Sequence, residues 1–151
     1  MPSIEEAIQQ TRFRNSLHRA QVNILYTSNW LNHKTMVTLK PFGLSLQQFN
    51  ILRILRGRGG QPSTVKLLTE RMLDKMSNAS RLVDKLKDKG LVERKQCPTD
   101  RRQVDILITQ KGLDLLAAAS AAIEKDIEGG FANLSSEEAD QLSQLLDKLR
   151  G

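Results

Sequence analysis

The sequence predicts a mainly α-helical protein that carries a single small β-hairpin. Two observations indicate this fold class. Apolar residues, most of them Leu, Ile, Val or Ala, recur at helical spacing through most of the 151 residues. Residues 91–109 instead alternate apolar and polar side chains on either side of a polar turn. The length suits one domain with a substantial core rather than two domains of the usual size.

The N-terminal residues predict one long helix that starts near Ser3 or Ile4 and runs towards Lys40. Its apolar positions at helical spacing are Phe13, Leu17, Ala20, Ile24 and Leu31. A helix of this length has more apolar surface than so small a protein can bury locally. Packing against a second subunit is therefore its simplest use.

Composition excludes several protein classes. The start of the chain, MPSIEEAIQQ, is acidic and amphipathic, unlike a signal peptide, and no apolar run is long enough to span a membrane. The one cysteine, Cys97, excludes an internal disulfide framework and an all-cysteine metal site. We therefore expect a cytoplasmic protein with no membrane contact.

The middle of the chain predicts two short helices joined by a glycine-rich loop. Pro41-Phe42-Gly43 ends the long helix, and Ser45 with Gln48 forms a capping box that starts the next one, which ends at Gly57. A second short helix begins at Ser63 or Thr64. No Gly-Lys-Ser/Thr follows the glycines of the loop, so a phosphate-binding loop is not indicated.

A basic segment, residues 75–102, follows these helices. It holds nine Lys or Arg and four acids, a net charge of +5 in a chain of net charge +6, which indicates a polyanionic partner. Its first part predicts a helix from Lys75 to Gly90, with Asp74 as a capable cap. The stripe that this helix buries is Ala79, Leu82, Val83 and Leu86. Two helices joined by so short a turn form a helix-turn-helix.

The hairpin comes next. Leu91 to Gln96 and Gln103 to Thr109 predict paired strands, with Val104, Ile106 and Ile108 facing inward. Residues 97–102 form a narrow polar tip, or wing, with two arginines. We expect Asp100 to accept a hydrogen bond from a nearby arginine and so to fix the geometry of the tip.

Two C-terminal helices complete the chain. Thr109 caps a long helix that ends at Gly129-Gly130. Ser135 and Glu138 form a second capping box, and the last helix carries a stripe of Leu142, Leu145, Leu146 and Leu149.

Several of these stretches resemble the multiple-antibiotic-resistance regulator (MarR) family. They are residues 90–94 (GLVER), 97–102 (CPTDRR) and 106–112 (ILITQKG), with residues 80–86 (SRLVDKL) similar to the recognition helix of the family. The resemblance covers nearly the whole chain. It implies one domain and an obligate homodimer, with residues 1–40 and 110–151 as dimerisation helices and 41–109 as a winged helix-turn-helix lobe.

The same resemblance implies binding of double-stranded DNA at a pseudo-palindromic operator, with Arg102 as the minor-groove arginine and Asp100 as its support. The first residues of a major-groove helix reach base edges, where Asn pairs with adenine and Arg with guanine. We expect phosphate contacts from Lys85, Lys89, Arg94 and Lys95. The candidate DNA-binding residues are Lys75, Met76, Ser77, Asn78, Ser80, Arg81, Lys85, Lys95, Arg101 and Arg102. A gap-free match to the family places Lys75 at the helix cap, which leaves the helix start open by one residue.

Members of this family commonly bind small aromatic or phenolic effectors. Trp30 and His33 lie about one helical turn apart and are candidate ligand-binding residues, although a core role for Trp30 and an ordinary polar role for His33 are the alternatives. Cys97 in the wing offers an alternative route, oxidant sensing, although an incidental exposed thiol is the simpler interpretation.

No catalytic constellation is present. His18 and His33 are fifteen residues apart with no carboxylate cluster near them, so neither a catalytic set nor a zinc site is indicated, and we expect no cofactor. The sequence thus predicts a DNA-binding transcriptional regulator, a ligand-responsive repressor rather than an enzyme. The alternative is a winged-helix module for protein or RNA interaction.

Overall fold

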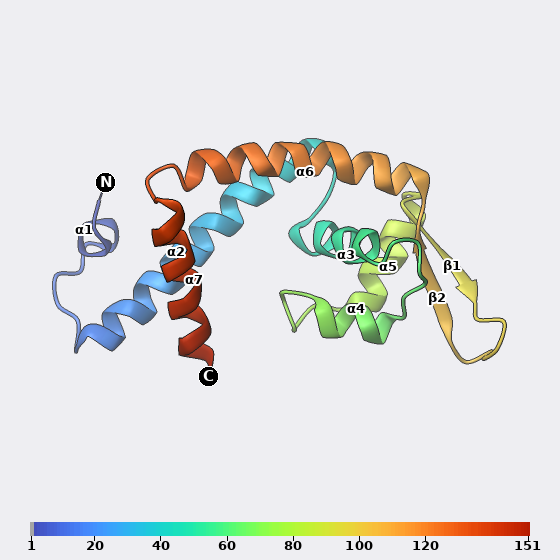
Figure 1. Ribbon diagram of the computed structural model, residues 1–151, viewed down its shortest axis with the longest axis horizontal. Coiled ribbons are helices and arrows are strands. Elements are labelled where there is room, and N and C mark those ends of the chain that lie inside the picture. Colours follow the sequence, from blue (N-terminus) through green and yellow to red (C-terminus); the bar gives the residue numbers. More distant parts are fainter. Residues whose placement is uncertain (1) are drawn as a thin grey trace. The chain divides into compact units, whose positions relative to one another are not determined.

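The helices and the hairpin follow one another in the predicted order (Figure 1). The computed structural model describes residues 2–151. Its elements are α1 (Ile4–Ile8), α2 (Ser16–Leu39), the 3-10 helix η1 (Lys40–Phe42), α3 (Leu46–Gly57), α4 (Val65–Arg71), α5 (Ala79–Asp88), β1 (Val92–Gln96), β2 (Val104–Ile108), α6 (Gln110–Gly130) and α7 (Ser136–Arg150). They divide into two compact units, Met1–Val37 and Thr38–Gly151. No helix within residues 2–151 is long and apolar enough to cross a membrane.

The N-terminal unit corrects the prediction of one continuous helix. Ser3 does start a helix through a capping box with Glu6, but α1 ends at Ile8 because Gln9 adopts a left-handed conformation, with φ of 54°. The chain becomes helical again only at Ser16, where the Asn15 side chain accepts a hydrogen bond from the His18 N–H. Local hydrogen bonds at Gln9 and Asn15 therefore interrupt the helix, although the apolar periodicity continues between them.

An ion pair joins the two helices of this unit. The Arg19 guanidinium of α2 binds both carboxylate oxygens of Glu5 in α1. This bond is the largest cause that lowers the pKa of Glu5 to about 2. Because the pair is exposed to solvent, it orients α1 more than it stabilises the fold.

The C-terminal unit holds the apolar core. Side chains from α3, α4, α5, β2 and α6 are fully buried there, among them Ile51, Leu68, Val83, Ile106 and Leu116. Four predicted caps are confirmed: Ser45 and Ser135 form capping boxes, and Thr64 and Thr109 accept hydrogen bonds from their first turns. The last turn of α2 is attached to α6, because the Thr38 hydroxyl donates to the Asp126 carboxylate.

A third segment of the chain, not predicted from the sequence, pairs with β2 of the hairpin. β1 and β2 pair antiparallel, with Arg94 opposite Ile106. Ser63, just before α4, pairs with Ile106 on the other side of β2, through N···O distances of 3.1 and 2.7 Å. The hairpin is therefore tied by main-chain hydrogen bonds to the segment that enters the helix-turn-helix.

The prediction that Val104 faces inward is wrong. Its side chain is 42 % exposed, whereas Ile106 is fully buried and Ile108 half-buried. Val104 pairs with Gln96 at the outer end of the hairpin, beyond the reach of the core, so alternation along the strand no longer implies burial. Its neighbour Asp105 is the buried residue, and its carboxylate accepts a hydrogen bond from the Gln103 amide.

A tight junction links the end of α5 to the start of α6. The Thr109 N–H donates to the Leu91 carbonyl and the Thr109 hydroxyl to the Gly90 carbonyl, at 3.0 and 2.7 Å. Gly112 lies against the Leu91 carbonyl. A Cβ atom at Gly112 would be only 2.2 Å from the Leu91 oxygen. Backbone occupies the space that any side chain would need, and only glycine fits.

Replacing this glycine should destabilise the protein. We expect Gly112→Ala to lower the free energy of unfolding by about 1–3 kcal/mol, because the overpacked side chain must displace backbone. Gly129→Ala in the same helix is the matched control, since nothing lies within 4 Å of its added methyl; it should stabilise by about 0.5–1 kcal/mol. Urea unfolding followed by circular dichroism measures both, and equal stabilities of the two variants would contradict the close contact.

Candidate nucleic-acid interface

The helix expected to read bases starts later than predicted. α5 begins at Ala79, with Asn78 as its N-cap, whose side-chain oxygen accepts the Arg81 N–H at 3.1 Å. Asp74 does not cap this helix. Its carboxylate and carbonyl accept the N–H groups of Met76 and Ser77, which closes a separate turn. Two capable capping residues compete here, and the later one begins the helix.

This shift places four candidate residues outside the helix. Lys75, Met76 and Ser77 lie in the turn before α5, where the Lys75 ammonium donates to the Glu70 carbonyl and Met76 is 92 % exposed. Ser77 is half-buried, with a hydroxyl oxygen that has no hydrogen-bond partner within residues 2–151. The Asn78 oxygen is already engaged by the cap, so bidentate pairing with adenine would disrupt the start of the helix.

The exposed face of α5 begins with Ser80 and Arg81. The helix buries Ala79, Val83 and Leu86 and half-buries Leu82, which confirms the predicted stripe. Ser80, Arg81 and Lys85 are all exposed. Within the described chain, the side chains of Arg81 and Lys85 form neither hydrogen bonds nor ion pairs, so both remain available to an outside partner.

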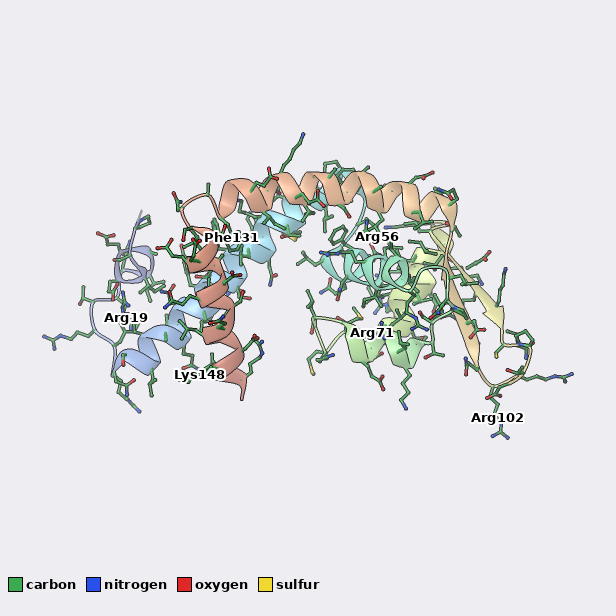
Figure 2. All side chains as sticks on the ribbon, viewed as in Figure 1. Arg19, Arg56, Arg71, Arg102, Phe131 and Lys148 are labelled. Atoms are coloured by element: carbon green, nitrogen blue, oxygen red, sulfur yellow. The ribbon has the colours of Figure 1, made fainter. Side chains whose placement is uncertain are left out.

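The wing tip is held by bonds to its main chain. The Asp100 carboxylate accepts the N–H of Arg102 at 2.9 Å, and the Gln96 amide donates to the Arg101 carbonyl at 3.1 Å. Asp100 thus does shape the tip, but through the backbone of an arginine rather than through its guanidinium. Both arginine side chains are left exposed, and Figure 2 shows Arg102 at the end of the hairpin, directed away from the lobe.

Two of the four expected phosphate ligands are engaged inside the protein. The Arg94 guanidinium pairs with Asp84 of α5 at 2.9 Å and approaches the Ser80 carbonyl at 3.4 Å, joining β1 to α5. Lys89 donates to main-chain and side-chain oxygens near the start of α3. Sequence alone offered no signal for these long-range partners. Lys95 stays exposed in a weak surface pair with Glu93, at 3.2 Å.

The candidate ligand-binding residues lie on α2, in the N-terminal unit. Trp30 is 44 % exposed, with the Lys34 ammonium 4.9 Å from the centre of its ring. His33 is also exposed. A Trp that keeps so much of its surface in solvent is not a residue of this unit's own core, and its ring face already attracts a cation.

The Cys97 thiol lies at the base of the wing tip. Its sulfur is 3.3 Å from the Thr99 hydroxyl oxygen, and the residue is half-buried. Hydrogen bonds from the Thr99 hydroxyl, and then from the N–H groups of Thr99 and Asp100, stabilise the thiolate and lower the pKa of Cys97. The thiol is therefore more reactive than an ordinary cysteine at neutral pH.

The comparisons with known proteins agree with this geometry. The MarR family model matches residues 42–103, which hold α3, the helix-turn-helix, β1 and the wing tip and end just before β2. The transcriptional regulator MhqR of Bacillus subtilis is 32 % identical over 107 residues, which cover 71 % of this chain and 72 % of MhqR. The chain belongs to the MarR family. The uncharacterised regulator YkoM of Bacillus subtilis is 33 % identical over 109 residues, which cover 72 % of this chain and 70 % of YkoM.

Solved structures of MarR-family regulators share the fold. The organohalide-sensing regulator RdhR, crystallised with 2,4-dichlorophenol, matches with a TM-score of 0.82 and 26 % identity, covering 93 % of this chain and 85 % of RdhR. Wild-type MarR of E. coli matches with a TM-score of 0.69 and 24 % identity, covering 83 % and 93 % of the two chains. The relatives are transcriptional regulators, not enzymes. The chain is accordingly a DNA-binding transcriptional regulator with a winged-helix fold.

The altered thiol gives a pH-dependent prediction. Because the thiolate is the nucleophile, the rate of Cys97 alkylation by iodoacetamide should rise with pH and reach half its maximum at a lower pH in the folded protein than for an ordinary cysteine. Thr99→Val removes the largest cause of the lowered pKa and should move the midpoint upward. The same cysteine in urea-unfolded protein is the control, and coincident midpoints in the folded and unfolded chains would contradict the hydrogen bonds to the sulfur.

Proposed function

We propose that this regulator is a ligand-responsive repressor that binds a pseudo-palindromic operator as a homodimer. One observation carries the proposal. The exposed first turn of α5 and the wing tip belong to the same lobe, and the Arg94–Asp84 ion pair joins their elements. The side chains of both tip arginines are unpaired within the described part of the chain. A helix and a hairpin held in this way can enter neighbouring grooves of one duplex.

The proposed contacts divide by role. Ser80 and Arg81 read base edges in the major groove, and Arg102 enters the minor groove, whose negative potential attracts arginine. Lys85, Lys95 and Arg101 contact phosphates. The turn before α5, which contains Lys75, Met76, Ser77 and Asn78, is proposed to lie along the backbone of the duplex rather than against its bases.

The homodimer is supported by apolar side chains left in solvent. In the C-terminal unit, α7 buries none of its residues, and its Leu142, Leu145 and Leu149 are 43, 58 and 67 % exposed. In the N-terminal unit, Leu17 and Leu25 are 79 and 58 % exposed. Apolar surface of this extent is typical of an interface. Residues 1–40 and 110–151 are therefore proposed as dimerisation helices around the lobe of residues 41–109, all within one domain.

A small aromatic or phenolic effector is proposed to control DNA binding. The support is the exposed Trp30 beside His33, and the relative RdhR, which has been crystallised with 2,4-dichlorophenol. Oxidant sensing through Cys97 is the second candidate, favoured by the lowered pKa of that thiol. Either signal acts in the proposal by releasing the operator.

The wing assignment can be tested on selected DNA. Duplexes bound from a random pool should contain a palindrome with half-sites about one helical turn apart. On such a duplex, Arg102→Ala should weaken binding by roughly 10- to 100-fold, because a groove contact worth about 1–3 kcal/mol is lost. Arg101→Ala, the neighbouring exposed arginine, is the matched control and should lose less. Gel-shift titrations measure both affinities.

Two outcomes would refute this function. Unchanged affinity of Arg102→Ala would remove the wing from the DNA interface. Failure of the selection to enrich any sequence, with weak and uniform duplex binding, would favour the winged-helix module for protein or RNA interaction instead.

The effector proposal rests on the only tryptophan of the chain. Adding 2,4-dichlorophenol should quench the fluorescence of Trp30 in a saturable way and release labelled operator over the same concentration range. His33→Ala should weaken both responses, whereas His18→Ala should weaken neither, because His18 is bonded within its own turn. Operator release without quenching would exclude Trp30 from the ligand site.

A further inference from the structure

The C-terminal end of α5 is held by a network that neither the helical periodicity nor the wing motif indicates. The helix ends in a Schellman motif, with the N–H groups of Gly90 and Leu91 bonded to the carbonyls of Lys87 and Leu86, at 2.9 and 3.0 Å. Lys89 is the C-cap residue of this motif. Its ammonium donates to the Gly43 carbonyl and to the Gln48 side-chain oxygen, the latter at 3.3 Å.

The two acceptors lie on either side of the start of α3, Gly43 in the connection from α2 and Gln48 in the first turn of α3. Gly43 ends η1 in a left-handed conformation, with φ of 67°. Gln48 is only 6 % exposed, and its side-chain oxygen also accepts the Ser45 N–H at 3.1 Å to complete the capping box of α3. A buried amide oxygen with two acceptor sites is thus satisfied by one local donor and one donor from α5.

A second lysine, which follows α5 in the chain, binds the same end of the helix. The Lys111 ammonium, in the first turn of α6, donates to the Lys89 carbonyl at 3.0 Å. Two cations at the negative end of a helix are favourable for its dipole. The C-cap residue of α5 is therefore bonded to the start of α3 and to the start of α6.

We propose that Lys89 is a positioning residue that sets the direction of α5, and with it the placement of Ser80 and Arg81 against base edges. The proposal rests on the proposed function of α5. The ten residues of α5 span about 15 Å, so a rotation of about 4° at its C-terminal end moves its first turn by about 1 Å. The buried apolar stripe opposes separation of the helix from the core but has no directional bonds to prevent such a rotation.

Salt dependence distinguishes this role from a phosphate contact. Lys89→Met should lower the ratio of specific to non-specific DNA affinity by about tenfold while leaving the slope of log affinity against log salt unchanged. Loss of a phosphate ligand instead reduces the slope by about one and weakens all sequences equally. Lys85→Met is the comparison variant with that second behaviour. Lys87 is an exposed lysine of the same helix whose side chain is unbonded among residues 2–151, and Lys87→Met should keep the specificity ratio of the wild type.

A double-mutant cycle tests the specific bonds. Gln48→Met removes one acceptor, so the additional loss of specificity caused by Lys89→Met should be smaller in that background than in the wild type. Thermal unfolding of each variant gives the folded fraction, and affinities are calculated per folded protein, so simple destabilisation does not imitate the effect.

The outcomes separate the two proposals. If wild-type protein selects no sequence, the proposed function fails before Lys89 is tested. If the wild type selects an operator but Lys89→Met reduces the salt slope, keeps the specificity ratio, or acts additively with Gln48→Met, the positioning role is overturned and the function stands.

Discussion

The junction between Gly90 and Thr109 is the constraint on which the DNA-binding lobe depends. The Leu91 carbonyl accepts the Thr109 N–H and lies against Gly112, while the Thr109 hydroxyl bonds the Gly90 carbonyl and the Gly112 N–H. Hydrogen bonds and a close contact among a few backbone atoms therefore join the end of α5, the base of the hairpin and the first turn of α6. Their relative directions cannot change independently, which is what a helix and a wing that bind one duplex require.

Local signals account for the features that the sequence predicted correctly. The helix caps join residues that are close in sequence, and such local bonds depend little on the rest of the fold. They are the capping boxes of Ser45 with Gln48 and Ser135 with Glu138, and the helix end at Gly90. The wing was predictable for a similar reason, because strand alternation flanks a polar turn. Resemblance to the family extended these local signals to a whole fold.

The errors arose where several local signals compete or where partners are distant in sequence. Asp74 and Asn78 are both competent caps, and in the folded chain Asp74 closes the turn to Met76 while Asn78 caps α5. Gln9 takes a left-handed conformation that its residue type does not favour. The pairing of Ser63 with Ile106 joins residues 43 positions apart, and the residue pattern of neither segment predicts it.

The charge of the basic segment illustrates the same division between composition and structure. Its nine cations indicated a polyanionic partner. In the folded chain, Lys75, Lys89 and Arg94 bond oxygens of the protein, and Lys95 forms a surface pair with Glu93. Within residues 2–151, the cations of this segment whose side chains have no protein partner are Arg81, Lys85, Lys87, Arg101 and Arg102. The number of counterions released from DNA scales with the number of phosphates that a protein neutralises. These five cations, with Lys95 when it leaves its weak pair, therefore set the largest number of phosphates that this segment could neutralise. The engaged cations have a different effect, because they bond the turn before α5 to α4, the C-terminal end of α5 to the start of α3, and β1 to α5.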